Sequence, residues 1–111
     1  MRLFKTLAIN TFRTEMKKTF NLIHEKIKYP RMIEAAKHEV RKYLKRSRRK
    51  ALPEGADYWD FECKFGTYEE DAQKVHLAEI DKLINEAESK KVEVFYVEVI
   101  PVPGVRKKKE D

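Results

Sequence analysis

The alternation of apolar and polar positions predicts three strands along the chain. Residues around Phe20 alternate up to Leu22, which predicts a first strand from about Lys17. The clearest alternation runs from Tyr58 to Phe65, and it predicts a strand with one apolar and one polar face. Val92 to Ile100 is dense in β-branched and aromatic residues, which predicts the last strand.

Apolar residues at helical spacing predict two helices between these strands. The first runs from about Pro30 to about Lys50, because proline suits the first turn of a helix and a regular apolar stripe follows it. The second begins at Thr67, since Thr67 and Glu70 have the spacing of a capping box. Its apolar stripe includes His76, which we therefore expect on an apolar helical face.

The elements follow one another in the order β-α-β-α-β, and Pro101 with Pro103 is expected to end the last strand. This pattern indicates an α/β two-layer sandwich, a three-stranded sheet with both amphipathic helices on one face. Strands joined through helices are usually parallel, which favours strand order 1-2-3. A chain of 111 residues suits one domain. We expect a flexible leader or upstream extension over 1–15, a globular domain over 16–104 and a charged tail over 105–111.

Positive charge is concentrated in one segment of the chain. The whole sequence has a net charge of +6, whereas Arg31 to Lys50 alone holds nine Lys or Arg against two Glu, a local charge of +7. Residues 54–100 carry thirteen acids and five bases, a local charge of −8. A concentrated cationic segment attracts polyanions, whereas the same charge spread evenly only confers solubility.

Composition narrows the class of protein. A chain with 41% hydrophobic and 11% aromatic residues is richer in apolar side chains than disordered sequences are. Cys63 is the single cysteine, so no intramolecular disulfide can form. No stretch reaches the roughly 18 apolar residues that a membrane span needs. We therefore expect a soluble, cytoplasmic protein that does not enter a membrane.

On a helical wheel, six cations of the predicted first helix lie opposite its apolar stripe. These candidate nucleic-acid-binding residues are Arg41, Lys42, Lys45, Arg46, Arg48 and Arg49. Along about two turns they can meet several phosphates of one strand, and arginine adds a planar fork that binds phosphate bidentately. The alternative is a solvated helix face whose cations stabilise the helix dipole and pair with acids of the second helix.

The sequence also contains candidate groups for base stacking, catalysis and metal binding, but each set is incomplete. One face of the sheet should remain open and carry Tyr58, Asp60, Glu62, Lys64, Tyr96 and Glu98. Exposed tyrosines there resemble the stacking platform of RNA-recognition modules, although the acids would repel phosphates and cross-strand packing also explains the tyrosines. The acids lack a base or nucleophile, so enzyme activity requires that one of them converge with a histidine in a closed pocket. Cys63 should be buried and inert, and no ligand spacing indicates a metal or cofactor.

Several segments carry a resemblance to a known family. They are R-R-K-A-L-P-E-G and D-Y-W-D-F-E-C-K-F-G within Lys45 to Gly66, V-H-L-A-E-I from Val75, and F-Y-V-E from Phe95. The chain resembles a family of roughly hundred-residue bacterial proteins classed as a domain of unknown function, over most of Met16 to Lys107. The resemblance implies a small bacterial cytoplasmic protein that begins near Met16. It implies no activity and no functional residue.

Two functions follow as hypotheses. In the first, a small binding module engages the backbone of RNA or DNA through the basic face of the first helix. In the second, a protein-interaction or self-association module docks this helix on an acidic partner, including the acidic half of a second copy. An enzyme comes third.

Overall fold

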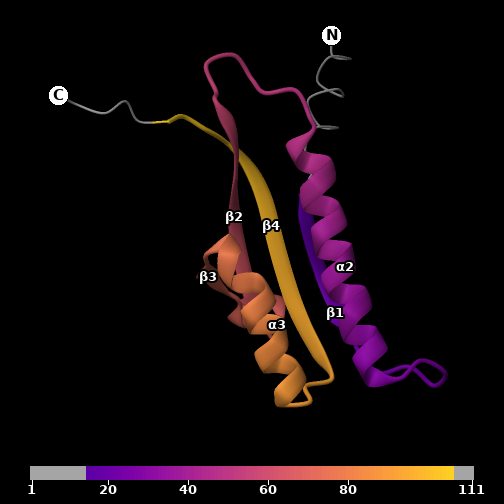
Figure 1. Cartoon of the computed structure of the whole chain (residues 1–111). Helices are drawn as coiled ribbons and strands as arrows, with labels where there is room; N and C mark the ends of the chain where they lie inside the picture. Colours follow the sequence, from indigo (N-terminus) through magenta and orange to yellow (C-terminus); the bar gives the residue numbers. More distant parts are fainter. Residues whose placement is uncertain (1–14, 107–111) are drawn as a thin grey trace, which may run out of the picture.

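The computed structural model describes residues 15–106, which form one sheet, two α-helices and two 3₁₀ turns (Figure 1). The elements in chain order are β1 (Met16–Asn21), α2 (Tyr29–Arg48), β2 (Tyr58–Gly66), η2 (Glu69–Asp71), β3 (Gln73–Val75), η3 (Leu77–Glu79), α3 (Ile80–Ser89) and β4 (Val94–Gly104). Both helices lie on one face of the sheet. The predicted leader, apart from Glu15, and the tail after Arg106 lie outside the described residues.

The first helix and the middle strand lie where the sequence predicts them. Pro30 is in the first turn of α2, and the helix ends before the segment that contains Pro53 and Gly55. β2 keeps the predicted alternation, with Phe61 and Cys63 buried on the helix side. Neither helix in the described part of the chain is long and apolar enough to cross a bilayer.

The sheet has four antiparallel strands in the order β1-β4-β2-β3, so the predicted three-stranded parallel sheet is wrong, whereas the α/β class holds. β1 and β2 run in the same direction, as a crossover through a helix requires, but β4 lies between them. Val99 of β4 pairs with Met16 on one side and with Cys63 on the other. The prediction failed for two reasons. The unpredicted strand β3 reverses the chain before α3, so β4 runs antiparallel to β2. A helical crossover also leaves open how many strand positions it skips.

The last strand is longer than predicted, because β4 runs through Pro101 and Pro103 to Gly104. Its pairing with β2 continues along this whole length. Its pairing with β1 ends at Val99, so among the described residues the other edge of β4 faces no strand beyond that point. Proline lacks a backbone N–H and is tolerated at such an edge. The prolines therefore mark a change in neighbours and not the end of the strand.

The segment after β2 is not the long helix predicted from Thr67. It forms η2, β3 and η3, and α3 begins only at Ile80. The predicted box of Thr67 and Glu70 fails because the backbone N–H of Tyr68 donates to Asp71 Oδ1 at 3.0 Å, which closes a short turn.

His76 lies in the same segment and is exposed, so its predicted place on an apolar helical face is also wrong. Its backbone N–H donates to Glu79 Oε1 at 3.0 Å, directly before η3. The apolar spacing is helical only from Ile80 onward, because the preceding residues are used in turns and in a strand.

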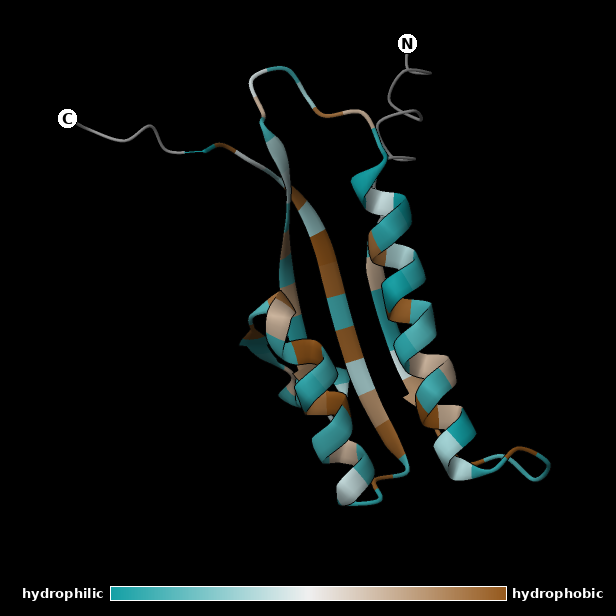
Figure 2. Ribbon diagram, viewed as in Figure 1, coloured by the Kyte–Doolittle hydropathy of each residue, from teal (hydrophilic) through white to brown (hydrophobic). Residues whose placement is uncertain are grey.

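The core lies between the sheet and the inner sides of both helices, while the outer sides of the helices are hydrophilic (Figure 2). Phe95 and Val97 on the central strand β4 are at most 1% exposed, as are Ile33 of α2 and Ile84 of α3. α2 therefore packs against the rest of the domain through one face only. The opposite face of α2 is left to solvent.

Candidate nucleic-acid interface

The C-terminal half of α2 carries five of the six candidate cations, Arg49 follows directly as the C-cap residue, and every one of these side chains is exposed. The residues Arg41, Lys42, Lys45, Arg46, Arg48 and Arg49 are called the basic surface below. The helix holds this orientation because Val40, Tyr43 and Ser47 are buried between the cations. The Tyr43 hydroxyl reaches the carbonyl of Val99 on β4 at 3.4 Å, which ties this half of the helix to the sheet.

Contacts between the two helices end near the middle of α2. Lys37 Nζ donates to Asn85 Oδ1 at 2.6 Å, and Arg41 lies 3.1 Å from Asp81 Oδ2. Because α3 begins at Ile80, none of its residues lies beside the last two turns of α2 (Figure 1). Within residues 15–106, Arg41 is the one member of the basic surface with an ion-pair partner.

The Arg41–Asp81 pair contributes little to stability. Both side chains are more than half exposed, and exposed pairs contribute about 0–1 kcal/mol. The alternative in which the second helix neutralises the basic surface therefore applies to Arg41 alone. The other five cations meet no carboxylate of the described chain at ion-pair distance.

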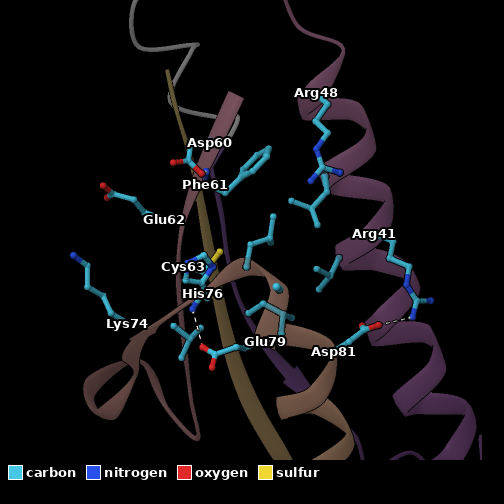
Figure 3. A pocket seen from close by; sticks show the side chains of 16 residues that line it. Arg41, Arg48, Asp60, Phe61, Glu62, Cys63, Lys74, His76, Glu79 and Asp81 are labelled. Carbon is cyan, nitrogen blue, oxygen red and sulfur yellow. Dashed lines mark hydrogen bonds and ion pairs between the residues drawn. The ribbon is translucent and has the colours of Figure 1, made fainter. Parts of the chain in front are cut away.

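A groove of about 910 Å³ separates the C-terminal half of α2 from β2 and the segment leading to α3 (Figure 3). Its floor is apolar and includes Leu44, Phe61 and Leu77. Arg48 lies at its α2 wall, with the guanidinium carbon 5.5 Å from the centre of the Phe61 ring. This contact places the Arg48 guanidinium over an aromatic ring. In the described structure the N–H groups of Arg48 have no acid partner.

The groove does not assemble the acid and base groups of an active site. Asp60 and Glu62 belong to its β2 wall, but their side chains point away from α2 (Figure 3). His76 is exposed and lies near Glu79, to which its backbone is bonded. Among the described residues, no three His, Cys, Asp or Glu side chains are placed to hold a metal ion.

The sheet face opposite the helices also differs from the predicted stacking platform. Tyr96 and Glu98 lie on this face but are only 3% and 9% exposed, and the Tyr96 hydroxyl donates to Glu98 Oε1 at 2.8 Å. Lys17 and Lys64 are the cross-strand neighbours of Glu98. Burial, followed by the hydrogen bond and charge of Glu98, raises the pKa of Tyr96. Tyr96 therefore offers no ring face to a base.

Cys63 is buried, as predicted, with 2% of its surface exposed. Burial, helped by the negative charge of Asp60, raises its pKa to about 11. The thiol is therefore protonated at neutral pH, and a protonated, inaccessible thiol is a poor nucleophile.

Sequence reasoning missed two cations that extend the basic surface, Lys50 and Arg106. They line an open cleft at the end of α2 together with Arg48 and Tyr58. Arg106 could have been found from the sequence only if β4 had been predicted to continue past its prolines. The antiparallel register pairs Gly104 with Tyr58 and so brings Arg106 back to the start of β2.

The fold is that of a small α/β domain. The model of a family of unknown function (DUF6172) matches residues 16–110, and the chain belongs to this family. The resemblance to a family of unknown function is thereby confirmed. Comparison with the curated proteins and with the solved structures finds no match.

Proposed function

We propose that the chain binds RNA or DNA by placing its basic surface against the sugar-phosphate backbone. The observation that carries this proposal is that ion pairs between the two helices end at Arg41. The other five cations of the basic surface are exposed and lie along about two helical turns. Dipole stabilisation needs one or two cations at a helix end, so five exceed that need. An unpaired cation can bind phosphate without first giving up a carboxylate, and it releases counterions from the nucleic acid.

Binding of this kind depends little on sequence. Phosphate contacts position a protein on a strand but carry no information about its bases. Three of the five unpaired cations, Arg46, Arg48 and Arg49, are arginines, whose planar fork fits a phosphate bidentately. With five contacts, log Kd should vary with log salt with a slope of magnitude about 3.5 on single strands, about 0.7 for each contact.

Charge reversal of the three arginines tests this proposal. The variant Arg46→Glu, Arg48→Glu, Arg49→Glu should bind a labelled oligonucleotide about tenfold more weakly or worse, because three of five phosphate contacts become repulsive. Fluorescence anisotropy across a salt series measures both the affinity and the slope. The slope should fall together with the affinity.

The matched control reverses three exposed lysines away from the basic surface, Lys26→Glu, Lys82→Glu and Lys90→Glu. It changes the net charge by the same amount, so it separates a local surface from the total charge of the protein. Equal losses in the two triple variants, or a wild-type Kd above about 1 mM at low salt, would show that the basic surface is not a nucleic-acid site.

Charge polarity supports a second candidate function, self-association. The acids Glu69, Glu70 and Asp71 form an exposed turn after the end of β2, whereas the basic surface lies toward its start. Nine residues of strand, about 30 Å, separate the two regions. Opposite charges at opposite ends favour head-to-tail contacts between copies.

Light scattering at low and high salt distinguishes self-association from nucleic-acid binding. Head-to-tail association predicts a mass above the monomer at low salt that falls to 13.3 kDa as salt screens the contact. Reversal of Glu69, Glu70 and Asp71 to lysine should abolish the larger species without weakening oligonucleotide binding. A monomer at every salt and protein concentration rules out this candidate.

A further inference from the structure

An open cleft of about 1010 Å³ lies at the end of α2, where the first residues of β2 meet the chain that leaves β4. It concentrates apolar side chains that are exposed to solvent. Within residues 15–106 six large hydrophobic residues are exposed, and three of them line this one cleft: Leu52 (38%), Tyr58 (36%) and Val105 (62%). Single exposed apolar residues are common, but a cluster of them marks a binding surface. We call this feature the terminal cleft.

Positive charge surrounds the apolar residues of the terminal cleft. Arg48, Lys50 and Arg106 line it, and the one acid among its lining residues is Asp57. Asp57 Oδ2 already accepts a hydrogen bond from the backbone N–H of Arg106 at 2.8 Å. The Arg106 guanidinium lies 5.5 Å from the centre of the Tyr58 ring. An occupant of this cleft therefore meets aromatic surface and cations at the same time.

The aromatic residues of the terminal cleft are held in place by the backbone beneath them. Tyr58 packs on Gly104, since a Cβ added at Gly104 would lie 2.5 Å from the Tyr58 ring. Trp59 Nε1 donates to the carbonyl of Lys50 at 3.0 Å, which ties the loop after α2 to β2. A cleft whose rings are fixed before binding loses less side-chain entropy when it takes a ligand.

Arg48 connects the terminal cleft with the basic surface. Its side chain lines the groove beside α2 and also the cleft, so the two regions form one continuous cationic path. A ligand that fits both must be a long polyanion with flat apolar groups. Single-stranded nucleic acid has this chemistry, because its phosphates follow one another along a flexible backbone and its bases are free to stack.

We propose that the terminal cleft binds an unpaired base of a single-stranded nucleic acid, stacked against Tyr58, while the backbone continues along the basic surface. The assignment rests on the nucleic-acid binding proposed above and adds strand selectivity to it. A base within a duplex is stacked on its neighbours and paired, so it cannot enter the cleft without first being unpaired. The protein should therefore prefer single strands.

The test compares three ligands by fluorescence anisotropy on the full chain: a labelled single strand of about 12 nucleotides, an abasic strand of equal length and a duplex. Tyr58→Ala should weaken binding of the single strand about tenfold, because the variant loses the stacking of one base on an aromatic ring. The salt slope should stay unchanged, since the phosphate contacts remain. Affinity for the abasic strand and for the duplex should not change.

Two control variants separate the ring from other effects. Tyr58→Phe keeps the ring and should bind the single strand as wild type does. Tyr68→Ala removes another exposed tyrosine, which lies in the turn after β2, and should also leave binding unchanged. If Tyr58→Ala does not fold, wild-type protein still decides the question, because it must bind the abasic strand about tenfold more weakly than the intact one.

The outcomes distinguish this proposal from the one on which it rests. Salt-dependent binding of intact, abasic and duplex ligands with equal affinity would retain the basic surface and overturn the base-stacking cleft. No binding by wild type would overturn both. An acidic peptide containing aromatic residues that competes for the cleft, and loses affinity in Tyr58→Ala while oligonucleotides do not, would replace the base with a protein ligand.

Discussion

Replacing Phe95 with alanine is expected to lower the unfolding free energy by about 3–5 kcal/mol, the usual cost of removing a buried phenyl group. Phe95 is 1% exposed and lies on β4, the strand that joins β1 to β2. Its ring centre is 5.4 Å from that of Phe20 and 5.3 Å from that of Phe65. The substitution removes contacts from both neighbouring strands at once. Since small domains are stable by only about 5–15 kcal/mol, this loss leaves the fold marginal.

Urea denaturation followed by circular dichroism measures this change in unfolding free energy. Ile23→Ala is the matched control, because it removes a large apolar side chain that is 57% exposed and should cost less than about 0.5 kcal/mol. Equal losses for the two variants would mean that Phe95 is not at the centre of the core.

Alkaline pH is the second large effect, with a loss of about 2 kcal/mol expected from Cys63 alone between pH 9 and 11. Burial raises the pKa of the folded-state thiol from 9.0 to about 11. Above pH 9 the unfolded chain therefore loses a proton that the folded chain keeps. Stability then falls with rising pH, by at most about 1.4 kcal/mol per pH unit midway between the two pKa values.

Buried tyrosines add to the same alkaline loss. Burial is the main cause that raises the pKa of Tyr43 and of Tyr96, so both hydroxyls stay protonated in the folded chain at a pH where the unfolded chain ionises them. Their contribution begins near pH 10, the ordinary pKa of tyrosine. The unfolding free energy should therefore continue to fall above pH 10 in a chain that lacks the cysteine.

Urea denaturation at pH 8, 9, 10 and 11 measures the alkaline loss, with Cys63→Ala as the control. Between pH 9 and 11 the wild type should lose about 2 kcal/mol more than this variant, because the variant keeps only the tyrosine contribution. Parallel curves for the two proteins would show that ionisation of Cys63 is not linked to unfolding.

Local periodicity was sufficient to predict α2 and β2. Ile33, Ala36 and Val40 recur on one side of α2, and Phe61 and Cys63 alternate along β2, so each pattern specifies its own element. The sheet order depends instead on which strands meet after the chain has folded. No local pattern records that β4 inserts between β1 and β2 or that its prolines face an edge.

The charges that surround the basic surface depend on the residue at which the second helix begins. The sequence pattern placed this helix start wrongly. A helix beginning at Thr67 and packed antiparallel to α2 would have placed Glu69, Glu70 and Asp71 beside the basic surface. In the structure the helix begins at Ile80, and those acids lie in a turn. The decisive contacts are local ones that the helical spacing does not reveal, namely Asp71 with the Tyr68 backbone and the close approach of Ala72 to Gly66.

The prolines of β4 also bear on aggregation. An unpaired strand edge is a template on which other chains can add strands, and this process leads to fibrils. Beyond Val99 one edge of β4 faces no strand of the described structure, but Pro101 and Pro103 cannot donate hydrogen bonds to an incoming chain. Replacing both prolines with valine would therefore supply hydrogen-bond donors along this strand edge. The domain would then be prone to aggregate through the end that carries the basic surface.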